Sequence, residues 1–219
     1  MAEQQQTLAQ LRESLARIEA GTESEAGTES GGQASSGSES EAGEQQTEAA
    51  PAQTEEAYAK ARAVVLRKLT GSAKSRHQLA EVLREREFGE DVITTVLDRM
   101  EEVQLLDDAA FARTWVRTRH ELKGLGSAAL RRELQQRGLA TDHIDAALEQ
   151  LSAEDEEAAA EELIANKLRG VTVPVGNGPE DRKERDKLTR RLVGMLGRRG
   201  HHPGAAMRLV REALASRTH

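Results

Sequence analysis

The sequence predicts an all-α protein in which three tandem three-helix repeats stack into an elongated, curved body. Apolar residues recur at helical spacing from residue 54 almost to the end of the chain, and no segment alternates as a half-buried strand does. A leucine–leucine–arginine frame also returns three times. Because one such unit is too small to bury a full core alone, we expect the repeats to pack on one another.

Residues 1–53 differ in composition from the rest and are expected to form a disordered acidic tail rich in Gly, Ser and Glu. A short helix near residues 7–19 is compatible with the apolar spacing there, either marginal by itself or binding a partner. Residues 1–55 hold eleven acids and two arginines (−9), leaving 27 acids and 29 basic residues (+2) in the remainder. The tail is therefore the source of the net charge of −7. We favour a solubilising role over screening of a basic surface or mimicry of nucleic acid.

The first repeat is assigned to residues 54–106. Its first helix carries an apolar face made of Tyr58, Ala61, Val65, Leu66 and Leu69. The second helix starts with a capping-box signature, with Ser75 as the N-cap and Gln78 three residues later. Gly89 separates it from a third helix, whose apolar positions are Val92, Ile93, Val96, Leu97 and Met100.

The second repeat, residues 107–151, begins with the stretch around which we expect the fold to be organised. It holds the only Trp of the chain, Trp115, and one of two Phe, Phe111, on one helical face. Asp108 is predicted to be the N-cap, and these three residues form the predicted structural anchor. Arg119 falls within the apolar stripe. We favour a last-turn arginine that caps carbonyls and extends outward, with a partly buried, paired cation as the alternative.

The third repeat, residues 152–219, contains an inserted Pro/Gly loop around 170–180 between its first and second helices. The repeated frame supports this position, because its first two copies lie 51 residues apart and the next two lie 62 apart. The surplus of eleven residues matches the loop, and an insertion at an existing turn leaves a core intact. The three copies are Leu79, Leu83, Arg86 and Phe88; Leu130, Leu134, Arg137 and Leu139; and Leu192, Leu196, Arg199 and His201.

Catalytic and metal-binding patterns are weak, so we expect no enzyme activity, cofactor or metal. His201 and His202 lie beside Pro203 and are interpreted as exposed imidazoles in a turn, because no spaced ligand partner accompanies them. Helix capping explains Asp107 and Asp108 without a magnesium ion. Phosphate-binding, dinucleotide-binding and nucleophile-elbow motifs are missing from the sequence. With no Cys and no secretory signal pattern, a cytoplasmic protein is expected.

Binding is the remaining class of function. Residues 182–211 carry ten Lys and Arg against Glu184 and Asp186, which favours an anionic partner. Arginines on helix faces suit DNA phosphates or acidic protein surfaces, although a solvated basic face explains the pattern about as well. The candidate partner-binding residues are Arg113, Arg117, Lys123, Arg131, Arg132, Arg190, Arg191, Arg198 and Arg199.

Several of these segments together resemble the RecX family of recombination regulators. The acidic and aromatic pairs occur in Leu105-Leu106-Asp107-Asp108, Phe111-Ala112 and Trp115-Val116, and they are followed by Gly126, Leu130, Glu133-Leu134 and Arg137-Gly138-Leu139. Lys74-Ser75-Arg76 with Gln78-Leu79 resembles the first unit of that family, and Leu192, Leu196 and Arg198-Arg199-Gly200 resemble the third. The resemblance covers about residues 57–216. Glu87 stands where the family usually has Gly, and His201 where an aromatic or aliphatic residue is usual.

The resemblance implies tandem three-helix repeats and a non-enzymatic protein that lies along the RecA filament on single-stranded DNA. It would mainly inhibit RecA, limiting ATP hydrolysis, strand exchange and recombination in DNA repair. We expect a monomer with weak direct contact to DNA at most. A free-standing DNA-binding helical module is the alternative, and it predicts tight, strongly salt-dependent binding to bare DNA.

Overall fold

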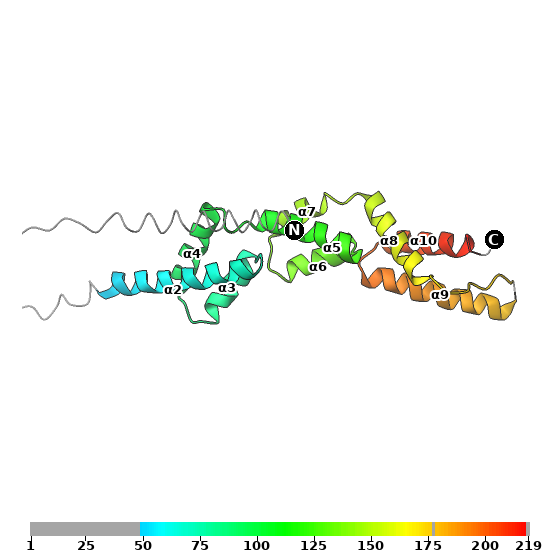
Figure 1. The fold of residues 1–219 in the computed structure, drawn as a ribbon, viewed down its shortest axis with the longest axis horizontal. Coiled ribbons are helices and arrows are strands. Elements are labelled where there is room, and N and C mark those ends of the chain that lie inside the picture. Colours follow the sequence, from blue (N-terminus) through cyan, green and yellow to red (C-terminus); the bar gives the residue numbers. More distant parts are fainter. Residues whose placement is uncertain (1–48, 177, 218–219) are drawn as a thin grey trace, which may run out of the picture. The chain divides into compact units, whose positions relative to one another are not determined.

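A computed structural model describes residues 49–176 and 178–217 of the chain (Figure 1). Every regular element in these residues is an α-helix, which confirms the all-α prediction. The helices are α2 (Ala49–Gly71), α3 (Arg76–Arg84), α4 (Glu90–Glu102), α5 (Asp108–Lys123), α6 (Ser127–Gln135), α7 (Thr141–Leu148), α8 (Ala153–Lys167), α9 (Pro179–Arg198) and α10 (Pro203–Ala215). The short helix considered near residues 7–19 lies outside the described residues, and α2 begins at Ala49, five residues before the expected start at 54.

Two compact units divide the described chain. The first contains residues up to Ala73 together with 79–106, and α2 packs against α4 within it. Its core is aliphatic apart from half-buried Tyr58 and Phe88, which pack against the buried cluster. The buried members are Ala61, Val64, Val65, Leu79, Ala80, Leu83, Val92, Ile93, Val96, Leu97, Met100 and Leu106. The apolar positions predicted for these helices are therefore buried core residues or, like half-buried Tyr58, Leu66 and Leu69, pack on the core.

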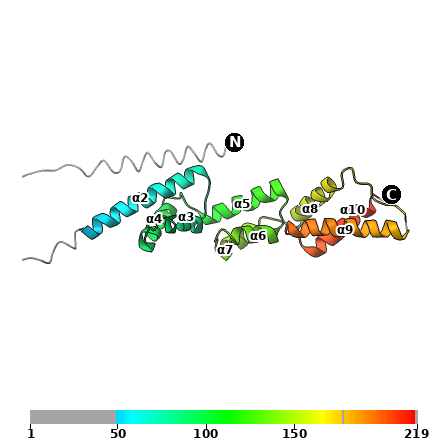
Figure 2. The same cartoon turned by 90° about the horizontal axis from the view of Figure 1, so that it is seen from below.

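The second unit contains residues 74–78 and the chain from Asp107 onward. It has two separate hydrophobic clusters, one formed by α5, α6 and α7 and one by α8, α9 and α10. The helices α8, α9 and α10 gather into one group in both views of the ribbon (Figure 1, Figure 2). The described residues between Lys167 and Pro179 form turns and a loop, and Val173 packs in the α8–α10 cluster.

The repeated frame has the same packing in all three copies. Both leucines of each copy are buried, with exposed fractions of 0 or 1%. The last member of each frame is also withdrawn from solvent, since Phe88 is half-buried and Leu139 and His201 are buried. The periodicity in the sequence therefore identifies equivalent core positions correctly.

The turn that follows the second helix of each group also repeats. The last frame residue donates its backbone N–H to the carbonyl oxygen of the second leucine, at 3.2 Å for Phe88, 3.3 Å for Leu139 and 3.1 Å for His201. The residue just before it has a positive φ, of 62° at Glu87, 70° at Gly138 and 85° at Gly200. This is the left-handed conformation that commonly ends helices and that glycine adopts without steric cost. The first group thus places a glutamate in a glycine position.

The helix starts show one predicted cap and one correction. Ser75 accepts from the Gln78 N–H and Gln78 Oε1 accepts from the Ser75 N–H, both at 3.2 Å, so the predicted capping box is confirmed. The N-cap of α5, however, is Asp107, whose carboxylate accepts from the Ala110 N–H at 2.8 Å, and not Asp108. Asp108 is the first residue of the helix and accepts instead from the backbone N–H of Arg76, at 2.8 Å. The prediction was wrong because a doubled aspartate fits either register.

Candidate interaction surface

The predicted binding residues that are exposed lie on α5, α6 and α9 of the second unit. Arg113 and Arg117 are exposed on α5, one helical turn apart, and Arg132 is exposed on α6. Lys123 is exposed at the end of α5, and the exposed cations of α9 include Arg190, Arg191 and Arg198. Within residues 54–176 and 178–217, none of the ion pairs involves these seven side chains. Their charges are therefore available to an anionic partner.

Two of the predicted binding residues are bound to other segments of the protein. The guanidinium of Arg131 is paired with Asp145, across from α6 to α7. Arg199 is half-buried, and its Nη1 donates to the carbonyl oxygen of Lys123 at the end of α5. Arg199 therefore holds two segments of the second unit together. This gives it a structural role that the sequence pattern did not reveal.

Trp115 is half-buried and lies at the centre of a mixed aromatic and charged cluster. Its ring stacks on Phe111, with centroids 5.7 Å apart and planes inclined by 22°. Its Nε1 donates to Glu133 Oε2 at 2.8 Å, and the guanidinium carbons of Arg119 and Arg137 lie 4.2 and 3.6 Å from the ring centroid. Burial lowers the pKa of Arg137 from its ordinary value. Phe111 belongs to the buried core of the α5–α7 group, and half-buried Trp115 packs against that core.

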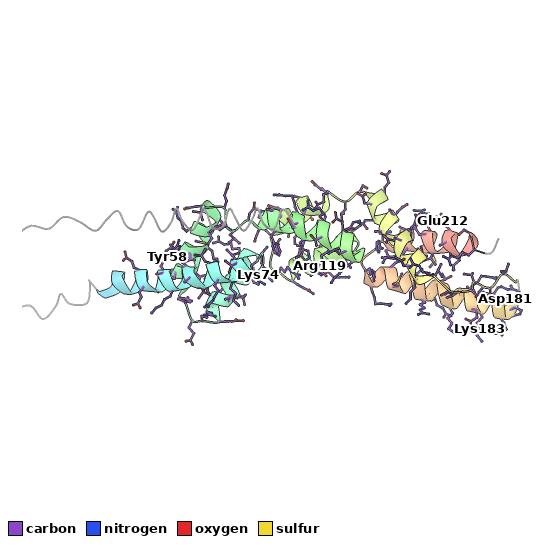
Figure 3. The ribbon with its side chains drawn as sticks, viewed as in Figure 1. Tyr58, Lys74, Arg119, Asp181, Lys183 and Glu212 are labelled. Atoms are coloured by element: carbon purple, nitrogen blue, oxygen red, sulfur yellow. The ribbon has the colours of Figure 1, made fainter. Side chains whose placement is uncertain are left out.

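Arg119 is a partly buried, paired cation, which is the less favoured of the two alternatives given for it above. The side chain of Arg119, which is labelled in Figure 3, is only 27% exposed, and its Nε lies 3.5 Å from Glu133 Oε2. Arginine faces aromatic rings well because its planar, weakly hydrated guanidinium is attracted to the ring quadrupole. The preferred prediction of an outward-pointing, carbonyl-capping arginine was wrong, because periodicity alone does not show that Glu133 lies opposite on α6.

The loop between α5 and α6 is held by three side chains that bind three successive carbonyl oxygens. Arg199 binds that of Lys123, His201 Nε2 lies 3.0 Å from that of Gly124, and His120 Nδ1 lies 2.9 Å from that of Leu125. The Gly126 N–H donates in return to the carbonyl oxygen of Arg199, at 2.9 Å. This polar joint connects the α5–α6 loop with the α9–α10 turn.

The prediction of exposed imidazoles was half wrong. His201 is buried, with an exposed fraction of 5%, and burial lowers its pKa from the ordinary value. His202 is exposed, and its Nδ1 caps α10 by accepting from the Gly204 N–H at 3.2 Å. The burial of His201 follows from its position in the repeated frame, where Phe88 and Leu139 fill the equivalent sites.

Residues 74–78 belong to the second unit and are joined to the rest of it by polar contacts. Buried Ser75 donates through Oγ to the carbonyl oxygen of Arg137, at 2.6 Å. Gly138 lies so close to His77 that a Cβ at this glycine would overlap the imidazole. The sequence contains both parts of this contact, the capping Ser75 and the Arg137-Gly138 turn. No local pattern shows that these residues, 62 positions apart, meet.

In the parts of the chain that the structure describes, no group of three or more His, Cys, Asp or Glu side chains is placed to hold a metal ion. None of the described helices is long and apolar enough to cross a membrane. The remaining feature of the second unit is its set of exposed arginines.

Helices grouped in threes, with equivalent cores and equivalent helix-ending turns, define a helical-repeat protein. Models of the first and second three-helix domains of RecX match residues 61–100 and 107–148. The chain is 47% identical over 154 residues to the regulatory protein RecX of Streptomyces coelicolor, covering 70% of this chain and 77% of that protein. It is 46% identical over 163 residues to the regulatory protein RecX of Thermobifida fusca, covering 74 and 83%. The chain belongs to the RecX family.

Solved structures agree with this fold. One crystal structure of regulatory protein RecX superposes with a TM-score of 0.64 at 24% identity, covering 76% of this chain and 79% of that chain. The crystal structure of RecX from Lactobacillus salivarius gives a TM-score of 0.60 at 16% identity, covering 72 and 96%. At these identities the likeness supports the fold alone.

Proposed function

We propose that this protein regulates recombination by binding, as a monomer, along the RecA filament on single-stranded DNA. It limits ATP hydrolysis and strand exchange without catalysing a reaction itself. The observation that carries this proposal is the 47% identity to a protein named regulatory protein RecX, over 154 residues. Function in DNA recombination would place the protein in the cytoplasm.

The exposed arginines support a filament-binding surface. Arg113 and Arg117 project from α5 one turn apart, and Arg190 and Arg191 lie on α9, all exposed. A guanidinium binds carboxylate or phosphate through two parallel hydrogen bonds, so either RecA acidic side chains or DNA phosphates are suitable partners. Three further exposed cations, Arg132, Lys123 and Arg198, add positive charge to this unit. Arg131 and Arg199 are less suitable, because each is already bound to another segment of the protein.

The direct test measures RecA ATP hydrolysis on single-stranded DNA with increasing amounts of this protein. The proposal predicts a progressive decrease that is complete near a stoichiometric ratio or below it. An unchanged rate in the presence of equimolar, demonstrably folded protein contradicts the proposal.

A variant pair locates the surface. Arg190→Ala with Arg191→Ala is expected to weaken filament binding and to change the melting midpoint by no more than about 3 °C, because exposed charges contribute little to stability. The matched control replaces Arg67 and Lys68, two adjacent exposed cations of α2, in the same way. Equal weakening by both pairs would mean that total charge matters and the position of the arginines does not. A collapse of the melting midpoint in the α9 pair would make those arginines structural.

A second candidate function is a free-standing DNA-binding module, favoured by the ten Lys and Arg against two acids in residues 182–211. It predicts tight binding to bare single-stranded DNA whose logarithmic affinity falls linearly with the logarithm of the salt concentration. The filament proposal predicts weak binding to bare DNA and strong binding to the RecA filament. Titrations of both ligands at two salt concentrations separate these functions.

A further inference from the structure

A groove runs between α9, α10 and the loop that precedes α9, all of which belong to the second unit. The two helices pack against each other (Figure 2), and the groove has a volume of about 800 Å³. Its apolar lining includes Val175, which is 66% exposed, half-buried Met207 and buried Leu214. An exposed valine together with a flexible methionine is apolar surface that a bound segment can remove from water.

The exposed valine lies in a loop that is held in place. The Nη1 of Arg185, on α9, donates to the carbonyl oxygens of Pro174 and Gly176, at 2.9 and 2.6 Å. Since these two residues lie directly before and after Val175, one guanidinium fixes the backbone on both sides of it. A partner therefore meets an apolar side chain on an ordered backbone, which lowers the entropy cost of binding.

Each helical wall of the groove also carries an exposed arginine. Arg190 lies on α9, where its Nε donates to the carbonyl oxygen of Asp186 in the same helix at 3.3 Å, and Arg211 lies on α10. Neither arginine takes part in an ion pair within the described residues. With Arg185, three arginines against one aspartate give the lining a charge of +2. The groove therefore favours an anionic partner.

The lining distinguishes an acidic polypeptide from a nucleic-acid strand. Single strands bind in grooves largely by stacking their bases on aromatic rings, and none of the described residues that line this groove is aromatic. A polypeptide, in contrast, can place apolar side chains on Val175 and Met207 and carboxylates on the arginines. Because the walls are helices, whose backbone groups are bonded internally, no strand can add to them, and an amphipathic helix is the form that fits.

We propose that the α9–α10 groove binds an acidic amphipathic segment of the protein component of the filament and does not bind its DNA. Apolar side chains spaced by three or four residues cover Val175 and Met207, and neighbouring carboxylates bind Arg190 and Arg211 through paired hydrogen bonds. The identity of the partner rests on the proposed function, whereas the preference of the groove for such a segment does not. Arg190 is thereby assigned to protein contact.

A direct test titrates the full-length protein into a fluorescein-labelled synthetic peptide and follows the fluorescence anisotropy. The peptide has leucines spaced by three and four residues, with glutamates and alanines elsewhere. Replacing its glutamates by glutamine, or its leucines by serine, should weaken binding about tenfold in each case. An oligothymidylate of the same net charge should not displace the peptide. A peptide that does not bind, or one that this oligothymidylate displaces at equal concentration, would overturn the proposal.

Variants of the protein locate the binding. Arg190→Gln with Arg211→Gln should weaken peptide binding about tenfold, and Val175→Ser should weaken it about threefold. The matched control is Arg113→Gln with Arg191→Gln, which removes two exposed charges of the same unit that do not line the groove. It should change the affinity by less than about twofold. Equal weakening by the two arginine pairs, with the melting midpoints unchanged, would show that the groove is not the binding site.

A competition experiment separates this inference from the proposed function. Excess peptide should release the protein from the RecA filament, the glutamine peptide should not, and the variant of Arg190 and Arg211 should bind the filament about tenfold more weakly. If the protein inhibits RecA ATP hydrolysis but this variant binds the filament as tightly as the native protein does, the inference is overturned and the proposed function stands. If the peptide binds the groove but RecA ATP hydrolysis is unchanged by the protein, the proposed function is wrong, and with it the identity of the partner.

Discussion

Glu87 offers a sharp test of the repeated helix-ending turn. It adopts φ = 62° where the equivalent turns have Gly138 and Gly200, at 70° and 85°. A residue with a Cβ pays about 1–2 kcal/mol for this conformation, whereas glycine loses about 0.5–1 kcal/mol more backbone entropy on folding. The difference predicts that Glu87→Gly stabilises the first unit by about 0.5–1 kcal/mol.

The effect can be isolated because the Glu87 side chain is exposed and joins none of the ion pairs in the described residues. Urea unfolding followed by circular dichroism measures the stability of the whole chain, and amide exchange in α3 and α4 measures that of the first unit. Glu87→Ala is the matched control, since it removes the same charge and keeps the Cβ, and it should change the free energy of unfolding by less than about 0.3 kcal/mol. If Gly and Ala at this position have the same effect, or if Gly destabilises the unit, the conformational argument is refuted.

Three further predictions concern the second unit. Trp115→Ala is expected to lower the free energy of unfolding by about 3 kcal/mol. Trp115→Phe should lower it by about 1.5 kcal/mol, since Phe keeps the ring packing but loses the hydrogen bond to the Glu133 carboxylate. Similar losses for both variants would contradict the geometry of that hydrogen bond. Ser75→Ala should cost about 2 kcal/mol in thermal unfolding, because it removes a cap and leaves the Arg137 carbonyl without its donor, whereas Ser75→Thr should retain most of that stability. Burial lowers the pKa of folded His201, so the unfolded chain binds the proton more readily. The contribution of neutral His201 to stability is therefore complete above about pH 6.5 and is lost as the pH falls below that value. His201→Phe should flatten this dependence between about pH 5 and 7 in urea unfolding, and an unchanged pH profile would contradict it.

Much of the helical architecture was predictable because it depends on local spacing. The Leu79–Leu83, Leu130–Leu134 and Leu192–Leu196 pairs are buried as their period requires. The same register also predicts the position of the inserted loop, since an added segment shifts every later position by its length. Apolar residues at helical spacing indicate which face of a helix packs on the core, because burial of apolar area largely determines which face is buried.

Apart from the N-cap of α5, where adjacent aspartates fit either register, the details that were missed depend on contacts between residues distant in sequence. The partners of Arg119 and His201 come from Glu133 and Gly124, which lie on other segments. The role of Arg199 as a donor to Lys123 could not be separated from that of an exposed cation by residue type alone. For the exposed arginines, the sequence identifies charge but contains no local signal that distinguishes a binding surface from a solvated one.

The single tryptophan and the single tyrosine of this chain lie in different compact units, Trp115 in the second and Tyr58 in the first. Selective excitation of indole emission therefore reports on the second unit without interference from the first. A carboxylate at Nε1 and two guanidinium groups over the ring should make that emission sensitive to any rearrangement of α5 against α6. The native protein thus carries its own optical probe, placed on the helix from which Arg113 and Arg117 project, and binding of a partner there can be followed in solution without attaching a dye.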